Sequence, residues 1–262
     1  MKIGIIGTGN MGSALMDAFA KDPSNTMVAY NRGTEKLNAV CVRTGAVAAS
    51  NEAEAAGDCD LLLLAVKPIM MPEVLEKIAP VILENQIIVS IAVGLTIESY
   101  AAVLGGDKKI VRAMPNTPAA VQAGLTAFSF GENVTADEQK QVLELFSLAG
   151  ETAVVPERLM NAVSALTGSS PAYVYMFIEA MADGACYAGI PRAEAYKMAA
   201  QAVLGAAKMV LETGKHPGVL KDEVCSPGGT TIRAVAELEK GGMRSSVIEA
   251  IKSCVDAAGQ KQ

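Results

Sequence analysis

MKIGIIGTGNMGS, residues 1–13, opens the chain and decides the fold of its N-terminal half. An apolar run ends at Ile6, three glycines follow in the spacing G-x-G-x-x-G, and apolar residues then recur at helical spacing. This order predicts a strand, a tight turn and a helix: Gly7 permits the turn, Gly9 lets the backbone approach a pyrophosphate, and Gly12 lets the helix pack against the strand. A glycine-rich turn without ligand is the alternative. The strand and helix in register favour a dinucleotide site beginning at Ile6.

The composition of the whole chain excludes several classes of protein. At 262 residues, 51% of them hydrophobic, the chain is long enough for one large or two modest globular domains. Its net charge of −6 argues against a nucleic acid partner. The five scattered cysteines form no C-x-x-C pair, which favours free thiols over disulfides or a metal site. The chain begins on the predicted strand and has no run long enough to cross a membrane, so we expect a cytoplasmic protein without a membrane partner.

The second predicted strand, Thr26–Tyr30, indicates which dinucleotide is bound. An acidic residue after this strand favours NAD because it binds the ribose 2′-hydroxyl, but here Asn31 and Arg32 stand in its place. An Arg side chain binds a 2′-phosphate that a carboxylate would repel. We therefore predict NADPH, with NADH as a weaker cofactor. The alternative is that Arg32 is a solvated loop residue.

Further apolar runs predict a mostly parallel sheet. The run Asp60–Val66 suits a central strand buried on both faces, and its carboxyl end at Lys67-Pro68 should face the same crevice as the glycine loop. A capping box at Thr135–Glu138 predicts a helix through Leu148. The other predicted strands are 46–47, 86–92, 109–114, 125–130 and an edge strand at 151–155, and further helices are predicted at 34–44 and after Asn51.

The pattern changes at residue 156, beyond which we predict helices only. They run from Ser169-Ser170-Pro171 to Gly189, from Pro191 to Gly214, over Thr230–Lys240 and over Met243–Ala258. Small or apolar residues lie on more than one face, which favours an obligate oligomer over a lone bundle. The predicted fold is α/β: an N-terminal Rossmann-type sheet domain over residues 1–156 and an all-helical substrate-binding and dimerisation domain over 157–262.

The segment CSPGGTT, residues 225–231, is a second stretch of bare backbone before a helix. Gly228 and Gly229 expose N–H groups, Thr230 or Thr231 is placed to cap the helix, and the helix dipole favours an anion such as a small carboxylate. An ordinary capped loop is the alternative. The single histidine, His216, lies in an apparent turn and is not predicted to be catalytic. The lack of a His–Asp pair favours reduction of a C=N bond, because an iminium is already electrophilic.

Together these segments resemble the pyrroline-5-carboxylate reductase family. The resemblance rests on IGIIGTGNMGSA, LLLAVKP, VRAMPNTP, LTGSSPAYVYMFIEAMADGA and SPGGTTIRAVAELEKGGMRSSVIEA, which span essentially the whole chain. It implies NADPH-dependent reduction of L-1-pyrroline-5-carboxylate to L-proline, the last step of proline biosynthesis. It also implies a homodimer formed through the C-terminal helices, with a decamer built from such dimers as the larger assembly.

The resemblance also implies which residues form the sites. Thr231 corresponds to the hydroxyl beside the imine nitrogen and is the predicted catalytic residue. The implied cofactor contacts, beside Asn31 and Arg32, are Ile6, Gly7, Thr8, Gly9, Asn10, Met11, Asn51, Ala65, Val66, Lys67, Pro68, Ile91, Ala92 and Val93. The predicted substrate contacts are Glu157, Glu223, Ser226, Gly228, Gly229, Thr230 and Thr231.

Two other functions fit parts of the sequence. A 3-hydroxyacid-type dehydrogenase pairs the same two kinds of domain but uses a lysine in the helical domain, and neither Lys197 nor Lys208 belongs to such a motif. A non-enzymatic NADP(H) sensor would not need the carboxylate site at residues 225–231. Both features favour the reductase.

Overall fold

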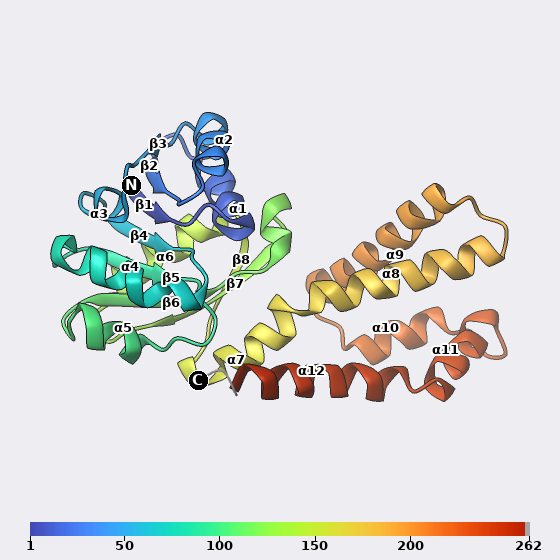
Figure 1. Ribbon diagram of the computed structural model, residues 1–262. Helices are drawn as coiled ribbons and strands as arrows, with labels where there is room; N and C mark the ends of the chain where they lie inside the picture. The colour runs from blue at the N-terminus through green and yellow to red at the C-terminus, as the bar shows by residue number, and fades with distance from the viewer. Residues whose placement is uncertain (260–262) are drawn as a thin grey trace. The chain divides into compact units, whose positions relative to one another are not determined.

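The computed structural model describes residues 1–259, and its contacts divide the chain into two compact units (Figure 1). The first comprises Met1–Ser169 and the end of the last helix from Cys254, and the second comprises Ser170–Ser253. The segment after residue 156 packs with the first unit, because Met160 is buried against Met114 and Ala127 of the sheet. The predicted domain boundary at residue 156 stays a prediction.

An eight-stranded sheet forms the centre of the first unit, in the order β3-β2-β1-β4-β5-β6-β7-β8. The β6–β7 pair is the only antiparallel pair in this sheet. The strand β8 pairs parallel to β7 and lies at the edge as predicted. The strands are β1 (Lys2–Ile6), β2 (Thr26–Tyr30), β3 (Val47–Ala48), β4 (Leu61–Leu64), β5 (Ile87–Ser90), β6 (Lys109–Met114), β7 (Gly124–Phe130) and β8 (Gly150–Val154). The strand β4 is shorter than the predicted 60–66: it ends at Leu64, and the Ala65 N–H makes the last hydrogen bond to β1, to the Ile6 carbonyl oxygen at 2.8 Å.

Helices cover both faces of this sheet. Apolar side chains of α1 (Asn10–Phe19), α2 (Thr34–Thr44) and α6 (Ala136–Ser147) pack on one face. Those of α3 (Glu52–Ala56), α4 (Met71–Ile78) and α5 (Ile97–Leu104) pack on the other. Short 3₁₀ turns lie at η1 (Pro68–Met70), η2 (Ala79–Val81), η3 (Thr117–Val121) and η4 (Glu157–Leu159). This is the predicted arrangement of a central parallel sheet buried on both sides.

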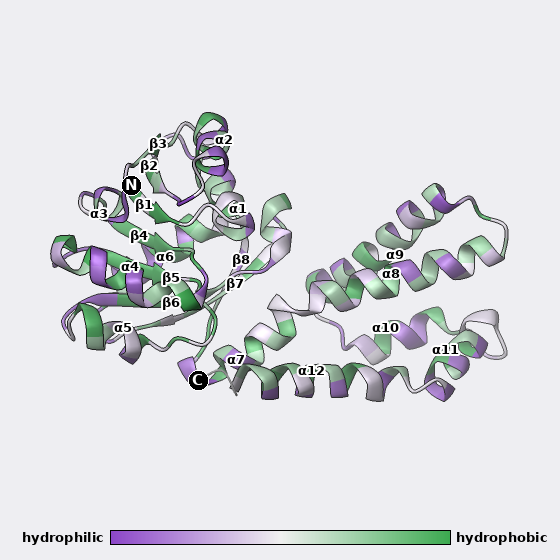
Figure 2. Cartoon of the chain, viewed as in Figure 1, coloured by the Kyte–Doolittle hydropathy of each residue, from purple (hydrophilic) through white to green (hydrophobic). Residues whose placement is uncertain are grey.

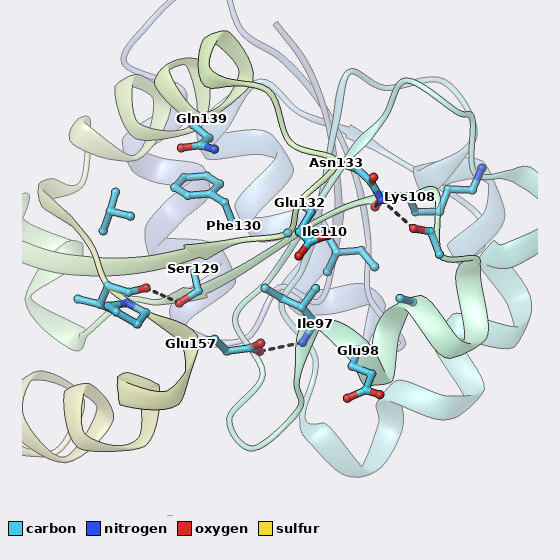
Figure 3. A pocket seen from close by; sticks show the side chains of 16 residues that line it. Ile97, Glu98, Lys108, Ile110, Ser129, Phe130, Glu132, Asn133, Gln139 and Glu157 are labelled. Carbon is cyan, nitrogen blue, oxygen red and sulfur yellow. Dashed lines mark hydrogen bonds between the residues drawn. The ribbon is translucent and has the colours of Figure 1, made fainter.

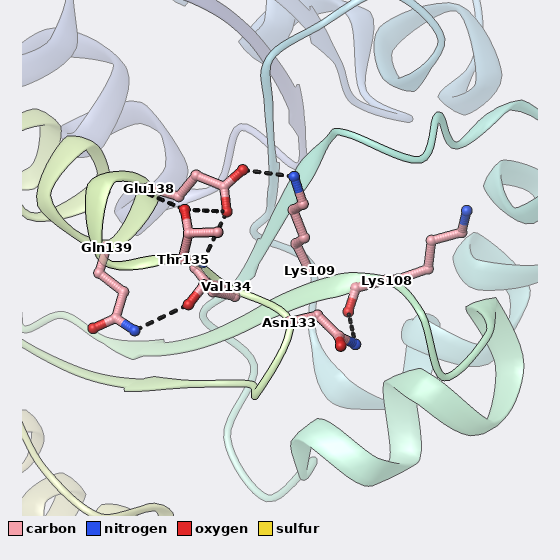
Figure 4. A network of polar contacts seen from close by, with 7 residues as sticks. All are labelled: Lys108, Lys109, Asn133, Val134, Thr135, Glu138 and Gln139. Atoms are coloured by element: carbon pink, nitrogen blue, oxygen red, sulfur yellow. Dashed lines mark hydrogen bonds and ion pairs between the residues drawn. The ribbon is translucent and has the colours of Figure 1, made fainter.

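The start of α6 confirms the predicted capping box (Figure 4). The Thr135 N–H donates to Glu138 Oε2 at 2.9 Å, and the Glu138 N–H donates to Thr135 Oγ1 at 3.4 Å. Lys109 Nζ also lies 2.6 Å from Glu138 Oε1, so the same carboxylate ties α6 to the start of β6. The box therefore fixes both the helix start and its place on the sheet.

The second unit is helical. After α7 (Met160–Val163) and the π-turn η5 (Ser164–Gly168) of the first unit come α8 (Ser170–Tyr187), α9 (Arg192–Thr213), α10 (Pro217–Val224), α11 (Thr230–Lys240) and α12 (Met243–Gly259). Through residue 259 no strand follows β8, as predicted. No helix in the described part of the chain is long and apolar enough to cross a membrane.

The predicted turn at His216 was wrong in part, because a helix begins directly after this residue. Pro217 does not continue a turn but occupies the start of α10, where its missing N–H costs nothing, and His216 Nδ1 accepts the Gly218 N–H at 3.0 Å as the cap. The predicted helix start at Ser169-Ser170-Pro171 agrees with α8, which begins at Ser170 directly after the helical turn η5, and the Ser169 hydroxyl lies 3.2 Å from Cys254 Sγ.

The helices of the second unit leave much apolar surface uncovered. Among the described residues of α8 to α12, only Ala182, Ala195 and Ala199 are buried. Tyr187 is 97% exposed and Leu211 is 82% exposed. Hydrophobic residues recur along α8 and α12 (Figure 2). A single copy of these helices does not form a closed core, which is typical of a surface that a second chain covers.

Candidate cofactor and substrate sites

The β1–α1 loop has the geometry that the glycine motif predicts. Gly7 has φ +106°, and a Cβ there would lie 2.5 Å from the Ala65 carbonyl oxygen. A Cβ on Gly12 would lie 2.1 Å from the Gly7 carbonyl oxygen, so the helix does pack closely on the turn. At Gly9, in contrast, a Cβ would meet no protein atom within 4 Å. Gly7 and Gly12 are therefore required by the fold, whereas the space at Gly9 is free for a ligand.

The residue between Gly7 and Gly9 supports the fit of the loop to a dinucleotide. Thr8 is buried, and its Oγ1 has no hydrogen-bond partner within the described chain. Its N–H donates to Asn31 Oδ1 at 3.2 Å, which ties the loop after β1 to the loop after β2. Asn31 also donates from Nδ2 to the Gly33 carbonyl oxygen at 3.1 Å. The two loops thus form one cradle with a buried hydroxyl that a bound phosphate or ribose group would satisfy.

The predicted 2′-phosphate residue is exposed and weakly paired. Arg32 Nη2 lies 3.8 Å from Glu73 Oε2, on α4. Glu73 in turn pairs with Lys77 at 2.8 Å, and that ion pair and Arg32 lower the pKa of the Glu73 carboxyl. An exposed ion pair at 3.8 Å contributes little, so Arg32 is free to turn toward an anion. Sequence patterns did not indicate Glu73, because it lies 41 positions from Arg32 on another element.

The remaining predicted cofactor residues follow other parallel strands. Ala65–Pro68 leave β4, and Ile91–Val93 leave β5. Asn51 follows β3 and caps α3, accepting the Glu54 N–H at 2.8 Å. Because parallel strands point the same way, these loops lie with the glycine loop at one edge of the sheet. The structure therefore brings the predicted cofactor residues together.

The β5–α5 loop is tied down by buried polar side chains that sequence reasoning missed. Ser90 Oγ accepts the Ala92 N–H at 3.2 Å and lies 2.5 Å from Tyr100 Oη. At the other end of the loop, Glu157 Oε1 accepts the Ile97 N–H at 2.8 Å (Figure 3). Burial raises the pKa of Tyr100 to about 12, so its hydroxyl stays protonated at neutral pH.

The predicted substrate residues fall into both units. Glu157 belongs to the first, where it borders a hollow of about 770 Å³ beside α5 (Figure 3) and its Oε1 also accepts from Arg112 Nη1 at 3.0 Å. Glu223, in the second unit, pairs with Lys215 at 2.6 Å. Both carboxylates are thus neutralised by cations of their own unit.

The loop before α11 has part of the predicted geometry. Gly228 has φ +69°, and Gly229 is the N-cap. The Gly229 N–H donates to the Ser226 carbonyl oxygen at 3.0 Å and so belongs to the turn. The prediction that a threonine caps the helix was wrong: Thr230 and Thr231 are its first two residues, and no side chain caps it. The helix start therefore leaves main-chain N–H groups available to an anion, and Thr231 is the second residue of the helix.

The fold and these loops define the class: a two-part α/β oxidoreductase with a dinucleotide site. The model of the family "Pyrroline-5-carboxylate reductase dimerisation" matches residues 157–261, and "NADP oxidoreductase coenzyme F420-dependent" matches residues 2–94. The pyrroline-5-carboxylate reductase of Escherichia coli K12 is 49% identical, covering 97% of this chain and 96% of that protein. That of Methanosarcina acetivorans is 41% identical, covering 95% and 94%. The chain belongs to the pyrroline-5-carboxylate reductase family.

Solved structures agree with this assignment. The crystal structure of Plasmodium falciparum pyrroline carboxylate reductase with NADP bound has a TM-score of 0.90 and 31% identity, covering 100% of this chain and 98% of that one. A structure of the Coxiella burnetii enzyme gives 0.91 and 32%, covering 99% and 98%. Both the resemblance and the fold class predicted from sequence are confirmed. The dimerisation match and the exposed apolar helices also confirm the prediction of a homo-oligomer.

Proposed function

We propose that this chain reduces L-1-pyrroline-5-carboxylate to L-proline with NADPH, as the last step of proline biosynthesis. The observation that carries the proposal is that this member of the family has two helix starts at which main-chain N–H groups are available to an anion. One is the Gly7–Gly9 loop with its open space at Gly9, and the other is the loop at Gly228–Gly229 before α11. The first fits a pyrophosphate and the second fits a small carboxylate.

The cofactor supplies a hydride for C5 of the ring when it is bound. The chain's own residues hold and orient the two reactants. The Thr8 hydroxyl and the amides that begin α1 hold the phosphates, and Arg32 holds the 2′-phosphate. The remaining cofactor contacts are the predicted ones: Ile6, Gly7, Gly9, Asn10, Met11, Asn31, Asn51, Ala65–Pro68 and Ile91–Val93.

The substrate is held by the loop before α11. Main-chain N–H groups at Gly228, Thr230 and Thr231 receive the carboxylate. The Thr231 hydroxyl orients the ring nitrogen and passes to it a proton taken from solvent as the C=N bond is reduced. Ser226 and Gly229 shape the turn. The predicted contacts of Glu157 and Glu223 with substrate stay predictions, and their cation partners support them by removing repulsion of the substrate carboxylate.

The activity is tested by following NADPH absorbance at 340 nm with purified protein and racemic pyrroline-5-carboxylate. We expect oxidation that consumes half of the racemate, with L-proline as product. Absence of oxidation, with NADPH binding still detectable by fluorescence, would contradict the proposed reaction. Reduction of NADP⁺ by a 3-hydroxyacid, seen as a rise in absorbance at 340 nm, would instead indicate the dehydrogenase.

Replacing Arg32 with Ala tests the cofactor preference. We expect the Kd for NADPH to rise about tenfold, the size of one lost hydrogen bond to a charged group, while the Kd for NADH changes less than about twofold. Arg43→Ala is the matched control: the substitution removes the same charge at another place, where Arg43 pairs with Asp17. Equal weakening of both cofactors would contradict the role of Arg32.

We also propose the assembly, the location and the domain roles that the sequence predicts. The helices from residue 157 onward form a homodimer, which would cover the exposed apolar side chains of α8 and α9, and dimers assemble into a decamer in the cytoplasm. Residues 1–156 bind the cofactor. Light scattering should give a mass near ten times the 27.1 kDa of the chain, and a mass of two chains would reject the decamer.

A further inference from the structure

A buried polar network lies beneath the loop that joins β5 to α5. Ser90 and Arg112 are direct neighbours on β5 and β6, so their side chains share one face of the sheet. Tyr100 of α5 packs on that face with no exposed surface. Arg112 is 4% exposed and donates to Glu157 at 3.0 Å. Two hydrogen-bonded pairs, Ser90–Tyr100 and Arg112–Glu157, thus lie side by side where the neighbouring buried positions are apolar.

This network has two contacts with the main chain, one at each end of the loop. The Ser90 hydroxyl receives the Ala92 N–H, and Glu157 receives the Ile97 N–H. Ile97 is the first residue of α5, whose N–H has no partner within the helix. Between the two contacts the chain is exposed at Val93 and passes through Gly94 at φ +86°. The exposed turn is therefore held only at its ends.

The strand order says which part of the cofactor this loop meets. Arg32 follows β2, on one side of the point between the parallel strands β1 and β4 where the strand order changes direction, and β5 lies on the other side. A dinucleotide lies across that point with one half on each side. With the 2′-phosphate at Arg32, the loop after β5 meets the nicotinamide half.

We propose that Tyr100 and Ser90, supported by Arg112 and Glu157, are positioning residues that hold the Ile91–Thr96 loop in the conformation that receives the nicotinamide half of NADPH. Stability alone does not explain them, because a fully apolar cluster of the same shape is commonly as stable as a buried polar one. The Tyr100 hydroxyl fixes the rotation of the Ser90 hydroxyl, which leaves a Ser90 lone pair directed at the Ala92 N–H. The inference rests on the proposed function.

Tyr100→Phe tests the proposal, since it removes one oxygen and keeps the ring. We expect faster amide hydrogen exchange over residues 91–97 of the free enzyme, measured by mass spectrometry. We also expect kcat to fall about tenfold, as a slight misplacement of reactants does, while the KM for NADPH changes less than about threefold. The deuterium isotope effect on kcat with 4-deuterated NADPH should rise, because the transfer step becomes slower relative to product release.

Ser90→Ala and the double variant sharpen the test. If both hydroxyls act through one contact, the double variant is no slower than Ser90→Ala alone. Val142→Ala is the control for stability: it removes two buried methyl groups from α6 on the other face of the sheet, so it should lower Tm without changing exchange in the loop or kcat.

Two results would overturn the inference: unchanged exchange and kcat in Tyr100→Phe, or an equal loss of kcat in Val142→Ala. Both require that the wild-type protein reduces pyrroline-5-carboxylate. If the wild type itself does not, the proposed function fails, and the exchange measurement on the free protein still tests whether Tyr100 orders the loop.

Discussion

Thr231→Ala should lower kcat about a hundredfold, the lower end of what one positioned proton-transfer group contributes, with NADPH binding unchanged. Thr231 is partly exposed at the second position of α11, behind the Gly228–Gly229 turn. A substrate carboxylate at the helix start would bring the ring nitrogen close to this hydroxyl. The predicted cofactor residues, in contrast, all lie in the first unit, so the Kd for NADPH should not change.

The structure makes this variant a clean test, because Thr231 does not cap its helix. Gly229 is the N-cap and no side chain provides a capping hydrogen bond, so removal of the hydroxyl should leave α11 intact and Tm nearly unchanged. Thr230→Ala is the matched control on the neighbouring residue and should retain most activity, because it keeps the main-chain N–H that is assigned to the substrate carboxylate. Thr231→Ser should restore turnover, because it returns the hydroxyl. Steady-state kinetics at saturating NADPH decide: if Thr231→Ala turns over as fast as wild type, the hydroxyl has no part in the reaction.

The parts of the fold that sequence predicted are those set by short-range patterns. The order of strand, glycine turn and helix fixes the cofactor loop: Gly7 and Gly12 are required by close contacts in the first unit, and Gly9 leaves open space. The capping box at Thr135 is equally local. The run of leucines in β4 is apolar throughout because both faces of the sheet are covered, which needs no knowledge of the covering residues.

What sequence did not predict depends on contacts between distant segments. Arg112 and Glu157 are 45 positions apart, and nothing in either neighbourhood indicates that they pair. Nothing in the sequence around Tyr100 indicates its contact with Ser90, because only the folded sheet places Ser90 beneath it. At Pro217 the error had another cause: proline followed by glycine fits both a turn and a helix start, and only the following turn of α10 distinguishes them.

Gly9→Ala should abolish most NADPH binding without destabilising the protein. Gly9 has φ −70° and ψ −172°, which any L-residue adopts, and an added Cβ meets no protein atom within 4 Å. The methyl group would instead occupy the space through which the backbone approaches the pyrophosphate. We expect the Kd for NADPH to rise about 100-fold, equivalent to about 2.8 kcal/mol at 1.4 kcal/mol per tenfold, with Tm unchanged.

Gly12→Ala provides the opposite case in the same motif. Its Cβ would lie 2.1 Å from the Gly7 carbonyl oxygen and 3.2 Å from Ala65 Cβ, so α1 must move away from the turn. Forcing a methyl group into such a contact costs about 1–3 kcal/mol of folding free energy, and Tm should fall. Thermal unfolding and NADPH titration of both variants therefore separate the two functions of the motif. If Gly9→Ala binds NADPH as tightly as the wild type does, the pyrophosphate does not lie in the open space at Gly9. No protein atom contacts the added methyl group, so no rearrangement of the protein could hide its effect on the cofactor.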